Sequence, residues 1–223
     1  MIRMKESLMI GLFLLSLNAC TKDRIDRFSV VYEVEFVSTW SASTHPTDFP
    51  SGAHFSPFVA VSHLSSSRLF IEGLSASEGL RNIAETGNTD KINEELEFFV
   101  NTGEGLDVIQ GNSFDSPGNS SKIQLGLREG YHYVTAVSMI APSPDWFVSA
   151  TTSLQDQTDG LWYDEVSSYV ISYDAGSDEG ISFSSANSPL DSIEPVTYLS
   201  EGPLTEGLDS VVNMGYFKFT RIK

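Results

Sequence analysis

The stretch FSVVYEVEFVSTW, residues 28–40, alternates apolar and polar side chains with the period of a β-strand. Successive side chains of a strand point to opposite faces of its sheet. One face would carry Val30, Tyr32, Val34 and Phe36, and the other would carry Val31, Glu33, Glu35 and Val37. The stretch therefore predicts a half-buried strand at the start of the fold.

Short runs of the same kind recur along the rest of the chain. They are FVAVSHL (58–64), KIQLGL (122–127), YHYVTAVSMIA (131–141), SYVISYD (168–174), PVTYL (195–199) and GYFKFTRI (215–222). Clusters of Gly, Pro, Ser and Asp separate these runs, as is typical of turns between strands. Many short strands joined by turns predict an all-β fold, an antiparallel β-sandwich.

One or two short helices interrupt the pattern of strands. In SASEGLRNIAETG, residues 75–87, the sequence predicts Ser75 as the N-cap, Glu78 as its capping-box partner and Gly87 as the residue that ends the helix. The following stretch, DKINEELEFF (90–99), is compatible with a further helix or with the start of a strand.

The charge of the chain excludes one class of partner. Its 223 residues contain 13 Lys and Arg against 30 Asp and Glu, which gives a net charge of −17. Such an excess of negative charge repels the phosphates of nucleic acids and anionic lipid head groups. We therefore expect no nucleic-acid partner.

The N-terminus predicts export and a lipid anchor. Two basic residues precede the apolar run LMIGLFLLSL (8–17), which is too short to span a bilayer and indicates a signal peptide over residues 1–19. LNAC (17–20) resembles the lipobox of bacterial lipoproteins, although Asn18 departs from the usual small residue. That resemblance implies lipidation of Cys20, the only cysteine. An ordinary signal-peptide cleavage beside a chance cysteine is the alternative.

These features give an expected organisation and location for the protein. Residues 20–27 would form the lipidated end and a tether, and residues 28–223 would form the sandwich domain. The protein would sit at the bacterial cell envelope, held to the membrane only by its lipid. Thr21 follows the cysteine where Asp would favour inner-membrane retention, so we expect the outer membrane.

The sequence offers little for nucleophilic or zinc-dependent catalysis. It contains neither G-x-S-x-G nor H-E-x-x-H, and we expect no enzyme. His45, His54 and His63 are nine residues apart, which matches no usual zinc spacing. Structural roles are favoured for these histidines, with zinc binding as the alternative.

Two acidic pairs have the residue types of glycosidase groups. They are Glu94 with Glu95 and Asp164 with Glu165. Such chemistry needs two carboxyl groups that face each other across a cleft, and the sequence does not show this. A solvent-exposed acidic surface is the favoured interpretation of both pairs.

A third set of carboxylates indicates a cation site. In ISYDAGSDEG (171–180), Asp174 and Asp178 flank a tight turn at the end of a predicted strand. Two carboxylates about 4 Å apart repel each other by about 4 kcal/mol at an effective dielectric constant near 20, and a hard cation would reverse that sign. Asp145, in PSPDWF (142–147), would supply a third ligand for Ca²⁺. Solvated acidic turns are the alternative.

Four blocks of the sequence, taken together, resemble the spondin N-terminal domain family. They are FVSTWSASTHPTDFPSGAHFSPFVAVSH (36–63), IEGLSASEGLRNIAETG (71–87), SMIAPSPDWFV (138–148) and YDAGSDEG (173–180). The resemblance implies an antiparallel β-sandwich similar to C2 domains. It also implies a calcium site on Asp145, Asp174 and Asp178, and a binding module without known catalysis. Animal members carry several cysteines and thrombospondin-type repeats, whereas this sequence has Cys20 alone and no such repeat, so their partners do not transfer.

The predicted function is a lipid-anchored, calcium-binding module for adhesion to an unidentified protein or glycan. Two alternatives stay open at this point. One is an envelope hydrolase in which calcium has a structural role, and the other is a purely structural envelope protein or a subunit of an assembly.

Overall fold

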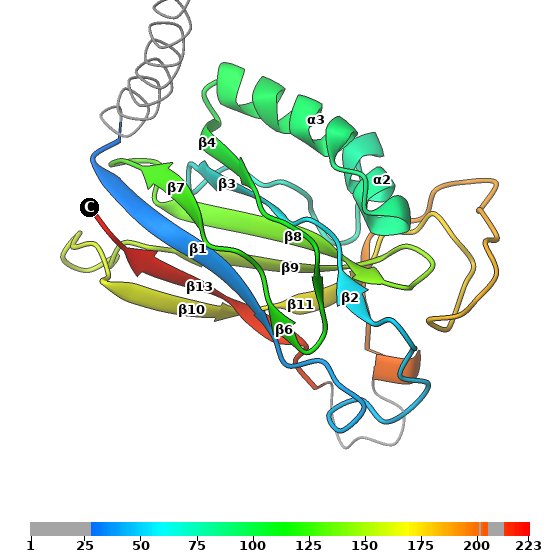
Figure 1. Ribbon diagram of the computed structural model, residues 1–223. Helices are drawn as coiled ribbons and strands as arrows, with labels where there is room; N and C mark the ends of the chain where they lie inside the picture. Colours follow the sequence, from blue (N-terminus) through cyan, green and yellow to red (C-terminus); the bar gives the residue numbers. More distant parts are fainter. Residues whose placement is uncertain (1–27, 201, 205–211) are drawn as a thin grey trace, which may run out of the picture.

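The computed structural model describes residues 28–200, 202–204 and 212–223. The predicted signal peptide (1–19), the lipidated Cys20 and the tether (20–27) lie outside the described residues. The described chain forms two antiparallel β-sheets that face each other, and two helices cover one of them (Figure 1).

The smaller sheet has five strands arranged around the N-terminal one. They are β1 (Val30–Ser38), β6 (Gly118–Asn119), β7 (Ile123–Leu127), β10 (Glu165–Tyr169) and β13 (Gly215–Arg221). Strand β1 pairs with β13 on one side and with β7 and β6 on the other. The first and last strands of the sandwich are therefore neighbours, with Phe36 opposite Phe217.

The larger sheet has eight strands and is centred on β8. They are β2 (His54–Phe55), β3 (Val59–His63), β4 (Gly105–Gln110), β5 (Phe114–Asp115), β8 (Tyr133–Ala141), β9 (Trp146–Ser153), β11 (Ile171–Asp174) and β12 (Thr197–Tyr198). Strand β8 pairs with β9 on one side and with β3 and β2 on the other. Strand β11 continues the sheet beyond β9.

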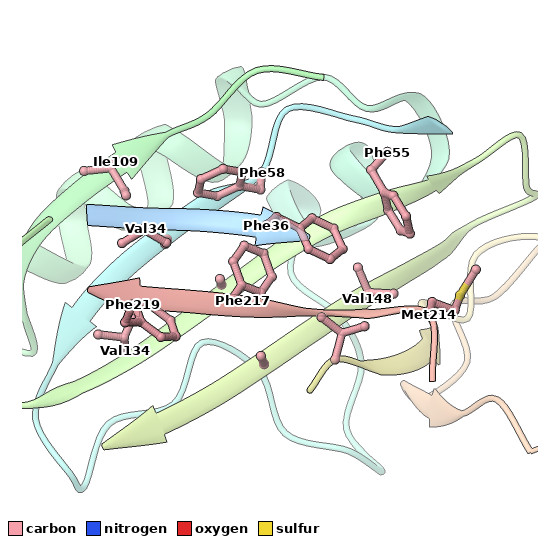
Figure 2. Close-up of a cluster of buried hydrophobic side chains, with 14 of the residues drawn as sticks. Val34, Phe36, Phe55, Phe58, Ile109, Val134, Val148, Met214, Phe217 and Phe219 are labelled. Atoms are coloured by element: carbon pink, nitrogen blue, oxygen red, sulfur yellow. The ribbon is translucent and has the colours of Figure 1, made fainter. Parts of the chain in front are cut away.

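The main core lies between the sheets and is rich in aromatic side chains (Figure 2). All four residues predicted for the inner face of β1 belong to it: Val30, Tyr32, Val34 and Phe36. The rings of Phe36 and Phe217 stack with their centroids 4.5 Å apart. The predicted alternation of β1 is confirmed, because Glu33 and Glu35 on its other face are only partly buried.

A second core lies between the outer face of the larger sheet and the helices α2 (Glu78–Thr86) and α3 (Asp90–Asn101). The helices contribute Leu80, Ile83, Ile92 and Leu96, and the sheet contributes Val59, Val61, Val137 and Phe147. A short 3₁₀ helix, η1 (Gly202–Leu204), follows β12. Among the described residues, no helix has the length and apolar character that a bilayer crossing requires.

The β-sandwich with two short helices is confirmed, and one predicted helix cap is wrong. The N-cap of α2 is Ser77, not Ser75, because the Ser77 hydroxyl accepts the backbone N–H of Leu80 at 3.1 Å. Gly87 ends the helix as predicted, with a φ of 70°. The ambiguous stretch 90–99 is helical and forms most of α3.

The predicted strand SYVISYD (168–174) is in fact two strands in different sheets. Strand β10 ends at Tyr169 and β11 begins at Ile171, so the chain changes sheets at Val170. Val170 is buried in the core between the sheets, and its N–H donates to the carbonyl of Gly215. The burial of Val170 explains why the strand is interrupted at this corner. The sequence does not show the interruption, because the alternating pattern continues through it.

Candidate metal centre

The three predicted aspartates lie on neighbouring segments at one end of the larger sheet. Asp145 is the last residue before β9, and Asp174 is the last residue of β11. Strands β9 and β11 are paired so that Asp174 lies opposite Trp146. Asp178 follows Asp174 across the turn of residues 175–177. The sheet register thus brings the two loops together.

Asp145 joins the loop before β9 to the turn after β11. Its side chain is fully buried, and its Oδ2 accepts three hydrogen bonds. The donors are the N–H of Ser177 at 2.7 Å, the hydroxyl of Ser177 at 3.2 Å and the N–H of Asp178 at 3.1 Å. The carbonyl of Asp145 also accepts the N–H of Ala175 at 3.1 Å. One carboxylate oxygen therefore holds the turn in place.

The conformation of the turn depends on a glycine. The N–H of Gly176 donates to Oδ1 of Asp174 at 2.7 Å, and Gly176 has a φ of +73°. A Cβ at this position would lie 2.3 Å from the carbonyl oxygen of Glu194. Only glycine fits such a left-handed position without strain at so close an approach.

Asp178 organises the loop that follows the turn. Its Oδ1 accepts the N–H of Gly180 at 2.8 Å, and its Oδ2 accepts the N–H of Ser188 at 2.7 Å. The side chain is buried. Both oxygens of this carboxylate already have a partner within the protein.

The carboxylates of the site influence one another electrostatically. Burial and, to a lesser extent, the charge of Asp174 raise the pKa of Asp145 to about 6, against the lowering effect of the Ser177 N–H. Burial also raises the pKa of Asp174, and the charges of Glu194 and Asp178 add to that effect. The site therefore concentrates negative charge in a region of reduced solvation, where each ionised group destabilises its neighbours.

The donor chemistry of this site fits calcium. Oδ1 of Asp145 is buried and has no hydrogen-bond partner among the described residues. A buried polar atom without a partner is costly, and carboxylate oxygens are ligands that Ca²⁺ prefers. The described part of the chain nevertheless contains no group of three or more His, Cys, Asp or Glu side chains that could hold a metal ion.

A hollow of about 560 Å³ opens beside Asp174. Asp48, Trp146, Ile181 and Leu199 also line it. Trp146 is almost fully buried and packs edge-on against Phe183, with ring centroids 5.4 Å apart. The aspartate loops therefore border a concave surface that has an acidic and an apolar part.

The three evenly spaced histidines have separate structural contacts. A ring nitrogen of each approaches a backbone carbonyl: His45 that of Val212 at 3.0 Å, His54 that of Gly52 at 2.8 Å and His63 that of Leu64 at 2.8 Å. His45 and His63 are fully buried. Across residues 28–200, 202–204 and 212–223, these histidines are part of no group that could hold a metal ion.

The acidic pairs with the residue types of glycosidase groups also have structural partners. Glu95 caps helix α2, because its two oxygens accept the N–H of Gly79 at 2.7 Å and the hydroxyl of Ser77 at 2.6 Å. The remaining three form ion pairs: Glu94 with Lys91, Asp164 with Arg221 and Glu165 with Lys218. The capping role of Glu95 was not predicted from the sequence.

Two further residues of the site escape the sequence prediction. Ser177 supplies two of the donors to Asp145, and Glu194 packs its backbone against Gly176, where its N–H donates to the Gly176 carbonyl at 2.8 Å. Glu194 immediately precedes the predicted strand 195–199. The pairing of β12 with β11 places Glu194 here, and no local sequence pattern shows that pairing.

Comparison with known proteins identifies the family. Residues 30–205 match the family described as Spondin_N. Over 178 residues, or 75% of this chain, it is 32% identical to Spondin-1 of Gallus gallus and 31% identical to Spondin-1 of Homo sapiens. It is also 29% identical to human Spondin-2 over 74% of this chain. The match spans 22% of the length of each Spondin-1 and 52% of Spondin-2. The chain belongs to the spondin N-terminal domain family.

Proposed function

We propose that this protein is an exported binding or adhesion module, without catalysis of its own, whose aspartate loops are ordered by Ca²⁺. Membership of the spondin family supports a role in binding. The proposed ligands of the cation are Asp145, Asp174 and Asp178. The partner that the module binds would be a protein or a glycan outside the cell.

One observation supports the calcium site above all others. The buried Oδ1 of Asp145 has no hydrogen-bond partner among the described residues, and the charge of Asp174 acts on the same carboxyl group. A divalent cation would supply the positive charge that these carboxylates lack. The chain itself holds Oδ2 of Asp145 on the turn of residues 175–178, which leaves Oδ1 available.

The cation would act on function by fixing the shape of the loops. Binding residues are often placed on loops that a rigid scaffold supports. Here the scaffold is the paired end of β9 and β11, and the loops border the hollow of about 560 Å³ beside Asp174. The recognition surface proposed for the partner is this end of the sandwich.

Calcium titration of the purified protein by calorimetry, together with thermal melting in calcium and in chelator, tests the proposal. We expect a single site and a higher melting temperature in calcium. Ligand linkage predicts a gain of about 2.7 kcal/mol when free calcium is about 100 times its dissociation constant. The absence of both binding heat and a change in melting temperature would contradict the calcium site and leave the loops as solvated acidic turns.

The proposed location at the bacterial outer membrane depends on lipidation of Cys20. Replacement of Cys20 by Ser removes the thiol that would carry the lipid. We expect the variant to leave the membrane fraction when the protein is expressed in a bacterium that processes lipoproteins. If the variant and the native protein fractionate alike, the anchor proposal is wrong.

A further inference from the structure

A second hollow, of about 350 Å³, lies on the outer face of the larger sheet. It opens between the segment 68–72 and strands β8, β9 and β11. The side chains that carry its chemistry are Arg68, Phe70, Glu72, Thr135, Thr151 and Tyr173. Ligand pockets in proteins have volumes of roughly 300–1,000 Å³, so this hollow would accept a small ligand.

A chain of hydrogen bonds determines which groups donate and which accept along the wall formed by β8 and β9. Nδ1 of His63 lies 2.8 Å from the carbonyl of Leu64, and a carbonyl only accepts, so Nδ1 carries a proton. Burial lowers the pKa of His63, which keeps the imidazole neutral and makes Nε2 an acceptor. The Thr135 hydroxyl, 2.9 Å from Nε2, must therefore donate to it.

The same reasoning determines what Thr151 offers to a ligand. The Thr135 and Thr151 hydroxyl oxygens lie 2.8 Å apart. Because the proton of Thr135 points to His63, the hydroxyl of Thr151 donates to Thr135 and has used its only proton. Thr151 is exposed and lines the hollow, so its oxygen presents lone pairs there as an acceptor.

The other walls supply a donor, a further acceptor and aromatic surface. Nη1 of Arg68 donates to the carbonyls of Ser65 and Ser67, both at 2.7 Å, which positions the guanidinium at the rim. The rings of Phe70 and Tyr173 meet edge-on with centroids 5.1 Å apart. The Glu72 carboxylate balances the Arg68 charge, so these lining residues carry no net charge within a strongly acidic protein.

We propose that this hollow binds one or two rings of a neutral saccharide. The hydroxyl groups of a sugar ring can donate to Thr151 and Glu72 and accept from Arg68. The C–H face of the ring can pack on Phe70 and Tyr173. Phosphorylated and other anionic ligands are disfavoured by the charge of the whole protein. The inference rests on the proposed role as a binding module, and it names a ligand class and a site that does not require the cation.

Nuclear magnetic resonance titration of the isotope-labelled protein with maltose, cellobiose, lactose and chitobiose tests the inference. We expect at least one of these sugars to shift the amide signals of residues 68–72, 135, 151 and 173. Thr151→Val preserves the shape of the side chain and removes the acceptor. Loss of one hydrogen bond should weaken binding about fivefold. Thr151→Ser keeps the hydroxyl and should bind like the native protein.

Thr152→Val is the matched control, because residue 152 is the next on β9 and points to the opposite face of the sheet. It should leave the affinity unchanged. The inference is overturned if none of the four sugars shifts these signals, if the shifts map elsewhere, or if Thr151→Val binds as well as the native protein. Titrations in calcium and in chelator separate this result from the calcium proposal, because sugar binding should persist in both.

Discussion

Two buried aspartates of the larger sheet and its adjoining loops have very different surroundings. Asp107, on β4, accepts the N–H of Gly126 on β7 at 2.8 Å, and its own N–H donates to the Ser62 hydroxyl at 3.2 Å. Asp107 thus links the larger sheet to the smaller one. Asp145 is also buried, but it lies within the electrostatic reach of Asp174, and its Oδ1 has no hydrogen-bond partner within the described chain.

The difference indicates what each carboxylate contributes. A buried carboxylate that accepts hydrogen bonds from the backbone stabilises the fold through those bonds. A buried carboxylate beside further negative charges destabilises the fold unless another group compensates for the repulsion. Asp107 therefore has a structural role within the protein itself. Asp145 also holds a turn through Oδ2, but its buried Oδ1 has no hydrogen-bond partner among the described residues and is the atom that we propose for the cation.

Replacement of each aspartate by asparagine should give the largest difference in calcium response between the two positions. Asp145→Asn removes a proposed ligand charge, so we expect loss of the calcium-dependent gain, about 2.7 kcal/mol at about 100 times the dissociation constant. Asp107→Asn keeps an oxygen that can accept the Gly126 N–H. It should reduce stability by about 1 kcal/mol and leave the calcium gain intact. Melting curves of both variants in calcium and in chelator provide the measurement.

The control variant decides how the result is interpreted. If Asp107→Asn also abolished the calcium gain, the response would reflect general charge screening by a divalent ion and not a site. If Asp145→Asn retained the gain, the carboxylates at this end of the sheet would be a feature of the fold alone.

Much of the fold can be predicted from local patterns, and strand β9 shows one place where such patterns fail. Strand β1 is placed correctly because its two faces have different environments, which gives a clear alternation. Strand β9 escapes prediction because its first five residues are all buried, one face against the main core and the other against the helices. A strand covered on both sides loses the alternation that identifies strands in a sequence.

For the candidate site, the sequence indicates the residues but not the contacts between distant segments. Asp145, Asp174 and Asp178 can be selected from the sequence because each carboxylate stands at or near the end of a predicted strand. The contact of Ser177 with Asp145 depends on how the turn folds back onto another loop. The helix cap that Glu95 provides depends on the packing of α3 against α2. Contacts of this kind join distant segments, and no local pattern encodes them.

The pH dependence of stability offers the smallest and most specific test of the comparison. The pKa of Asp145 is raised from 3.8 to about 6 in the folded protein, so the folded state binds this proton more tightly than the unfolded state. Between these two values the folded state carries the extra proton, and stability falls as the pH rises through that window. In chelator, acidification from neutral pH should therefore stabilise the native protein relative to Asp145→Asn.

Calcium should reverse the sign of this dependence, because protonation of Asp145 removes a ligand charge and competes with the cation. Urea unfolding of the native protein, Asp145→Asn and Asp107→Asn at a series of pH values, in calcium and in chelator, provides the measurement. Asp107→Asn is the control variant, since it leaves Asp145 in place. If Asp145→Asn and the native protein showed the same dependence in chelator, the burial of Asp145 would impose no charge penalty. Asp145 and Asp107 would then differ in their position in the fold but not in the free-energy cost of burying their charge.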